Sequence, residues 1–437
     1  MDENRGPQRE KEQKKDGLQE EVPMEENPAE YSFMQEMIKD EAGGKRKIRN
    51  DIWRTAGLGL VFGIVASFSF CAVKPWMENR FQKDPQQVTI PEEEEEEEGA
   101  ETEKPEETEV IEPVLDTDSY RKMQKAVSAV AVDAEKSVVE ITGITDDQAW
   151  MTEAYDHSGS VSGLIVADNG RELLILGKIS PVKGAGEIRV TFSDGATCTA
   201  DILMEDSSLD LGVYSVARSV IPESTWAQIK TAVLGSSTTA QKGDPVIVLG
   251  RQFGYAGSMG FGTMSSNKNT IETADGRYHL ICTDIAGAIG GTGVIVNLNG
   301  EIIGMIDQSI SEGEGKNLVT GYGISDLKKN IELLSNGQAV PYIGIRGLDV
   351  TSDMEDQGIP KGVYVREVET DSPAMAAGIQ SGDVITKIDG TKVASLSAYH
   401  TALMDEKSGI EVKVEGMRQG AGGYVDIEFT VMIGSSQ

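Results

Sequence analysis

Cysteine and histidine are both scarce in this chain of 437 residues, which has three of each. Cys71, Cys198 and Cys282 include no CxxC pair, so their spacing predicts neither a zinc site nor a disulfide framework. A single Cys198–Cys282 disulfide is left open, although two buried thiols are the favoured interpretation. Three histidines are also too few for a histidine-rich metal centre. We therefore expect no metal site and no cofactor.

Basic charge is also in short supply, with 40 Lys and Arg against 72 Asp and Glu and a net charge of −32. This balance excludes nucleic acid as an expected partner, because phosphate binding needs a basic face. Residues 91–118 alone contribute −14 and include seven consecutive glutamates, Glu92 to Glu98. Like charges and prolines extend such a segment, so residues 77–118 are predicted to form a disordered acidic stalk. A solvated spacer is favoured over a cation-binding role for the glutamates.

One long hydrophobic run is present. Residues 55–73 contain no charge, and as a helix they would extend about 28 Å, enough to cross a bilayer core. Basic residues crowd its N-terminal side: Lys45, Arg46, Lys47, Arg49 and Arg54. Residues 51–76 are therefore predicted to be an uncleaved transmembrane signal anchor. The disordered segment 1–50 would lie in the cytoplasm and the rest outside. A buried globular helix and a cleaved signal peptide fit these flanks less well.

The composition becomes globular from about Ser119. Between 119 and 337, short apolar runs recur every 8–15 residues with Gly, Asp and Asn at the breaks, a pattern typical of a β-sandwich or barrel. Helical patterns at 119–136 and 325–337 flank these runs. Residues 338–435 differ, with four predicted strands (363–368, 384–389, 410–417 and 424–432) and helices at 372–379 and 395–406. The sequence thus predicts a mainly β unit followed by an α+β unit.

The segment SPAMAAGIQSGDVITKIDGTKV (372–393) resembles the PDZ family. Resemblance implies that residues 338–435 bind extended C-terminal peptides by strand addition and hold the terminal carboxylate with backbone N–H groups. The run from Pro341 through Tyr342, Ile343 and Gly344 to Ile345 is similar to the family's carboxylate-binding loop. Tyr399 and Ala402, on the helix at 395–406, are weaker candidates for the wall of the peptide groove.

Residues 120–435 as a whole resemble the HtrA/Deg serine proteases. The resemblance rests on SVVEIT, SGLIVADNG, SSLDLGVYSV, QKGDPVIVLGRQFG, GSMGFGTMSS and CTDIAGAIGGTGVIVNLNGEIIGM. It implies a trypsin-like double β-barrel over 119–337 followed by a PDZ domain. The order of anchor, stalk, double barrel and PDZ domain is similar to that family's membrane-tethered layout.

Two of the three catalytic residues of that family are replaced. The triad acid is retained as Asp210 in SSLDLGVYSV, but Lys178 occupies the histidine position and Gly291 the serine position. An ion pair between Lys178 and Asp210 is the structural interpretation of the lysine. The alternative is an active serine-type endopeptidase in which Thr292 is the nucleophile and Lys178 the base.

The leading hypothesis is a membrane-anchored HtrA-like pseudoprotease in the cytoplasmic membrane. Its PDZ domain would bind the C-termini or unfolded segments of exported or misfolded proteins, in envelope quality control or as a scaffold. A homo-oligomer, by resemblance a trimer, is a further expectation. Besides the active endopeptidase, a passive surface spacer is the third possibility.

Overall fold

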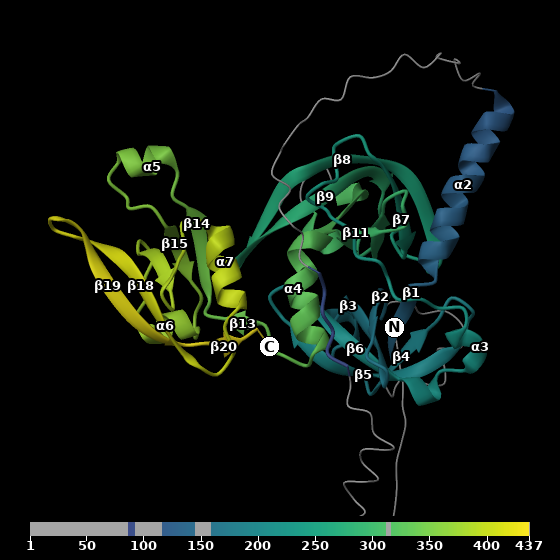
Figure 1. Cartoon of the computed structure of the whole chain (residues 1–437), viewed down its shortest axis with the longest axis horizontal. Coiled ribbons are helices and arrows are strands. Elements are labelled where there is room, and N and C mark those ends of the chain that lie inside the picture. The colour runs from purple at the N-terminus through teal and green to yellow at the C-terminus, as the bar shows by residue number, and fades with distance from the viewer. Residues whose placement is uncertain (1–85, 92–115, 145–158, 312–315, 437) are drawn as a thin grey trace, which may run out of the picture. The chain divides into compact units, whose positions relative to one another are not determined.

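A computed structural model describes residues 86–91, 116–144, 159–311 and 316–436. Within these ranges the chain is mainly β, with two closed barrels followed by a smaller module of strands and short helices (Figure 1). The predicted fold class, a trypsin-like double barrel followed by an α+β module, is confirmed. No helix in the described ranges is long and apolar enough to span a membrane. The predicted anchor, the cytoplasmic segment and most of the stalk lie outside those ranges.

The first barrel closes in the order β1-β2-β3-β6-β5-β4. Its strands are β1 (Val138–Ile144), β2 (Ser160–Asp168), β3 (Glu172–Lys178), β4 (Glu187–Thr191), β5 (Thr197–Asp206) and β6 (Leu211–Ala217). Helix α2 (Thr117–Glu135) precedes this barrel, and the side chain of Asp116 caps it by accepting from the backbone N–H of Ser119. The short α3 (Glu223–Trp226) follows it. Three single 3₁₀ turns, η1 (Ser180–Val182), η2 (Arg218–Val220) and η3 (Gln308–Ile310), complete the connections.

The second barrel closes in the order β10-β11-β12-β9-β8-β7. Its strands are β7 (Pro245–Gly250), β8 (Ser258–Thr273), β9 (Gly276–Ala286), β10 (Thr292–Val296), β11 (Ile302–Asp307) and β12 (Leu318–Gly323). Helix α4 (Ile324–Ser335) follows at once. The hairpin β8–β9 is the longest in the barrel pair, with strands of 16 and 11 residues.

Strand β3 illustrates why these runs are hydrophobic at every position. Leu173 and Ile175 face the interior of the first barrel, whereas Leu174 and Leu176 point the other way, into a core shared with the second barrel and helices α2 and α4. Successive strand residues face opposite sides, so burial on both sides demands an uninterrupted apolar run. The sequence signal was strong here for that reason.

The C-terminal module has its own core and a sheet in the order β14-β15-β16-β18-β19, with β17 added to β16. The strands are β14 (Ile345–Asp349), β15 (Val363–Val368), β16 (Val384–Ile388), β17 (Thr391–Lys392), β18 (Glu411–Gly420) and β19 (Gly423–Met432). Strands β13 (Pro341–Tyr342) and β20 (Gly434–Ser435) pair separately. The helices are α5 (Ser352–Asp356), α6 (Pro373–Ala377) and α7 (Leu396–Met404). Because β14 ends the sheet, one of its edges is unpaired within the sheet.

A bidentate ion pair links Asp383, the residue before β16, to Arg418 of β18. Arg418 Nε and Nη2 lie 2.6 and 2.8 Å from the carboxylate oxygens of Asp383, whose side chain is 1% exposed. We predict that Arg418→Ala destabilises the chain by about 2–3 kcal/mol, since removing one partner leaves a buried charge uncompensated. The value lies below that for a fully buried pair because Arg418 is a third exposed.

Urea-induced unfolding measures this effect. Lys392→Ala, a change at an exposed cation of the same module, is the control and should alter stability by at most about 0.5 kcal/mol. A similarly small loss in Arg418→Ala would contradict the prediction.

Candidate functional site

Strand pairing brings the predicted catalytic positions into one neighbourhood. Lys178 ends β3 opposite Leu211, which begins β6. Asp210 is the residue before Leu211, so the side chains of Lys178 and Asp210 start close together. In the second barrel Thr292 begins β10 directly opposite Asp307, the last residue of β11. The side chain of Lys178 reaches across to Asp307, which joins the two barrels at this point.

Lys178 forms an ion-pair network. Its Nζ donates to both carboxylate oxygens of Asp307 at 3.0 and 2.9 Å and to Ser309 Oγ at 3.0 Å, and lies 3.3 Å from Asp210 Oδ2. The side chains of Lys178 and Asp307 are 10% and 5% exposed. The predicted pair with Asp210 is present, but Asp307 is the closer partner. Every N–H of the ammonium group has an acceptor, so the lysine is engaged in a structural contact.

Asp210 is positioned by the turn that follows Lys178. Its carboxylate accepts from the backbone N–H of Ser180 at 2.8 Å and from the Ser180 hydroxyl at 2.6 Å. Its backbone has φ of 53°, in the left-handed region that Asp tolerates better than most residues. Its side chain is 33% exposed. Burial, and then the charge of Asp210, raises the pKa of Tyr214, whose hydroxyl donates to the backbone carbonyl of Lys178.

The loop at Gly291 has no room for a side chain. A Cβ added there would lie 2.8 Å from the backbone oxygen of Gln252 and 3.0 Å from that of Ala288. The Gly291 N–H itself donates to Ala288 O at 2.9 Å. In serine proteases the nucleophile's own N–H helps to bind the oxyanion. Here that donor already has an internal acceptor.

Thr292 is buried, with 3% of its surface exposed. Its hydroxyl oxygen accepts from the backbone N–H of Ser162 at 2.9 Å, and its carbonyl accepts from the N–H of Arg251 at 2.8 Å. Both contacts hold β10 in place between the barrels. This environment does not favour the hypothesis of Thr292 as a nucleophile, because a substrate carbonyl must reach the hydroxyl.

The predicted carboxylate-binding loop does hold a carboxylate. The backbone N–H groups of Ile343, Gly344 and Ile345 donate to the side chain of Asp275 at 2.7, 2.6 and 3.0 Å. Gly344 has φ of 87°, and a Cβ there would lie 2.4 Å from the Cβ of Ser372. Glycine is therefore required for the loop to turn its successive N–H groups toward one anion.

The other residues predicted for the peptide site lie either beside this loop or in the core of the C-terminal module. Tyr399 is fully buried and its hydroxyl donates to Asp275 Oδ1 at 2.6 Å. Tyr342 lies beside the loop, with its hydroxyl donating to Glu369 at 2.8 Å. Ala402 is 6% exposed and packs in the core of the module. Of these two helix residues, Tyr399 contributes its hydroxyl to the site as a further donor to Asp275.

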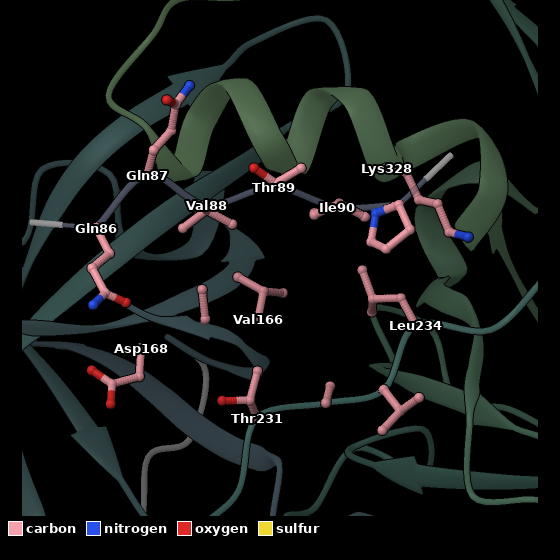
Figure 2. A pocket seen from close by; sticks show the side chains of 14 residues that line it. Gln86, Gln87, Val88, Thr89, Ile90, Val166, Asp168, Thr231, Leu234 and Lys328 are labelled. Atoms are coloured by element: carbon pink, nitrogen blue, oxygen red, sulfur yellow. The ribbon is translucent and has the colours of Figure 1, made fainter. Parts of the chain in front are cut away.

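Some features near the barrels are separate from both sites. Within the described ranges, no group of three or more His, Cys, Asp and Glu side chains could hold a metal ion. Cys198 and Cys282 are free thiols, the first buried and the second partly exposed. A hollow of about 550 Å³ lies between the segment 86–91, strand β2 and residues 231–234. Figure 2 shows the side chains that line it. None of its lining residues belongs to the Lys178 network or the carboxylate loop.

Asp307, Ser309 and Asp275 were not predicted from the sequence to belong to either site. Asp307 ends an apolar strand with a charged residue, which is a weak signal for a buried partner. Asp275 stands before Gly276 in an Asp-Gly pair, and that pattern predicts only a turn.

Family comparisons match both parts of the chain. The family model described as a trypsin-like peptidase domain matches residues 161–305, and that described as a PDZ domain matches residues 341–429. The first match contains Lys178, Asp210 and Gly291, and the second contains the carboxylate loop.

The curated relatives that the chain resembles are described as serine proteases. The chain is 28% identical over 292 residues to the "Serine protease Do-like HtrA" of Lactobacillus helveticus, covering 61% of this chain and 67% of that protein. It is 30% identical over 280 residues to the "Serine protease Do-like HtrB" of Bacillus subtilis, covering 59% of each. The chain thus spans about three fifths to two thirds of the length of these relatives.

A solved structure supports the fold. The "HtrA-type protease AlgW with decapeptide" aligns with a TM-score of 0.51 at 19% identity, covering 71% of this chain and 98% of that one. At this identity the likeness establishes the architecture of barrels and terminal module.

Proposed function

Because this chain belongs to the HtrA/Deg family, we propose that it is a catalytically inactive member whose PDZ domain binds free C-termini of exported or misfolded proteins. It would be anchored in the cytoplasmic membrane by residues 51–76, with barrels and PDZ domain outside and the N-terminus inside. Its role would be in envelope protein quality control or as a scaffold. Self-association, as a trimer, is part of the same proposal.

The observation that carries the binding role is the convergence of three backbone N–H groups, those of residues 343–345, on one carboxylate. Such a nest of donors suits a carboxylate at the end of an extended peptide. The unpaired edge of β14 beside the loop offers backbone groups for strand addition.

The inactive role is supported by what stands at the catalytic positions. Gly291 has no hydroxyl, Lys178 is bound to Asp307, and the N–H of Gly291 donates within its own loop. A nucleophile, a base facing it and a free oxyanion donor are all needed for acyl transfer.

Peptide binding is testable with the full-length chain in detergent micelles. The probe is an equimolar pool of fluorescein-labelled decapeptides that vary in an apolar last residue and end in a free carboxylate. We expect fluorescence polarisation to rise with this free-acid pool and at least about tenfold weaker binding of the same pool with amidated C-termini, because amidation removes the charge that the N–H groups bind. Equal binding of both pools would contradict the proposed recognition of C-termini.

A further inference from the structure

The tip of the β8–β9 hairpin lies in the carboxylate loop. Thr273 and Gly276 pair at the end of the hairpin, leaving Ala274 and Asp275 as its two-residue turn. Asp275 has φ of 58°, and this left-handed backbone directs the tip of a barrel strand pair toward the C-terminal module. Figure 1 shows the hairpin reaching α7, and contacts between β9 and α7 agree.

Four donors surround the carboxylate of Asp275. Ile343 and Gly344 bind Oδ2 through their N–H groups, while the N–H of Ile345 and the hydroxyl of Tyr399 bind Oδ1. Only 4% of Asp275 is exposed. Burial raises the pKa of this carboxyl group, and the four hydrogen bonds oppose that rise. The donors are therefore fully occupied by a group of the chain itself.

The backbone of Asp275 also makes contacts that a bound peptide would make. The N–H of Asp275 donates to the carbonyl of Ile345 at 2.7 Å, on the edge of β14 that strand addition would use. The Asp275 carbonyl lies 2.9 Å from Nδ1 of His400 on α7. The hairpin thus places a carboxylate in the loop and a backbone donor on β14 at once.

Ion pairs flank the hairpin on both sides. Arg277 of β9 lies 2.6 Å from Asp349 at the end of β14, and Arg366 of β15 lies 3.2 Å from Glu272 of β8. These pairs are partly exposed, so each adds little. The hairpin is therefore held to the C-terminal module mainly through the carboxylate of Asp275. Few other strong interactions would have to break for the hairpin to leave the loop.

We propose that the β8–β9 hairpin is an internal ligand of the PDZ domain, and that a peptide with a free C-terminal carboxylate binds by displacing Asp275 from these four donors. The inference rests on the proposed function and adds its regulation. Two carboxylates cannot share the same N–H groups, so hairpin and peptide exclude each other. Ligand binding at the PDZ domain then releases a hairpin of the second barrel.

Asp275→Asn tests this competition, since it keeps the shape of the side chain and removes its charge. A site that is closed in nine molecules of ten binds about tenfold more weakly than an open one. We expect the full-length variant to bind the free-acid pool at least about tenfold more tightly than the wild type, with little change for the amidated pool. Hydrogen exchange of residues 272–278 should become faster in the variant without peptide.

Asp389→Asn is the matched control, because Asp389 also precedes a glycine with a left-handed backbone but is exposed. It should leave both readouts unchanged. If Asp275→Asn does not fold, Asp275→Gly gives the same readouts, because glycine adopts this backbone without strain.

Two results would overturn the inference, and they differ. Equal affinity of wild type and variants for the free-acid pool would contradict the proposal that the hairpin is an internal ligand. The proposed peptide-binding function would still stand. If neither the wild type nor any variant binds the free-acid pool, the proposed peptide-binding function is contradicted, and so is the inference that rests on it.

Discussion

Purified full-length chain should release no peptides from casein and should not be labelled by a fluorophosphonate probe. Loss of either the serine or the histidine from a serine protease lowers kcat by about two million-fold, and the proposed function places Gly291 and Lys178 at those two positions. Lys178 is bound by two carboxylates, and Thr292 is buried with its hydroxyl accepting from Ser162. The expected product signal therefore equals that of buffer, whereas trypsin treated in parallel gives full labelling.

Substitutions sharpen this expectation. Gly291→Ser alone should remain unlabelled, because its Cβ would lie 2.8 Å from a backbone oxygen and Lys178 still faces Asp307. Labelling of the wild type that disappears in Thr292→Ala, with both proteins folded by circular dichroism, would overturn the inactive assignment. It would establish the alternative endopeptidase instead.

The second large effect is on stability. Lys178→Met should lower the free energy of unfolding by about 3–5 kcal/mol, because Asp307 then remains buried without its cation. Asp210 contributes less to the loss, since it is a third exposed and also bonded to Ser180. Urea-induced unfolding followed by circular dichroism measures the difference.

Two comparisons separate charge from packing. Lys183→Met removes an exposed cation five residues further on and should change stability by no more than about 0.5 kcal/mol. Adding Asp307→Asn to Lys178→Met should recover part of the loss, because the unpaired charge is then removed. A loss below about 1 kcal/mol in Lys178→Met would show that the ion pair does not hold the barrels together.

Strand and loop positions were largely predictable from the sequence. The apolar runs predicted between 119 and 337 correspond to strands such as β3 and β7, since burial on both faces leaves a continuous apolar signal. Strands β5 and β8 were not predicted, because buried and exposed positions are mixed along them and this weakens the apolar signal. The loop at 341–345 was predicted from its resemblance to the PDZ family, and its Gly344 has the positive φ that such a turn of backbone N–H groups requires.

By itself, the sequence determined the order of apolar segment, acidic run, barrel strands and terminal module, together with the residues that the family resemblance places at the triad positions. These features depend on residues within a few positions of one another. Only the tertiary structure decided which residues these side chains and backbone groups contact. Lys178 meets Asp307 across 129 positions and Ile343 meets Asp275 across 68, and no local pattern encodes either contact. Only the closure of the barrels and the reach of one long hairpin bring a buried charge to its counterpart and a carboxylate to the loop that binds it.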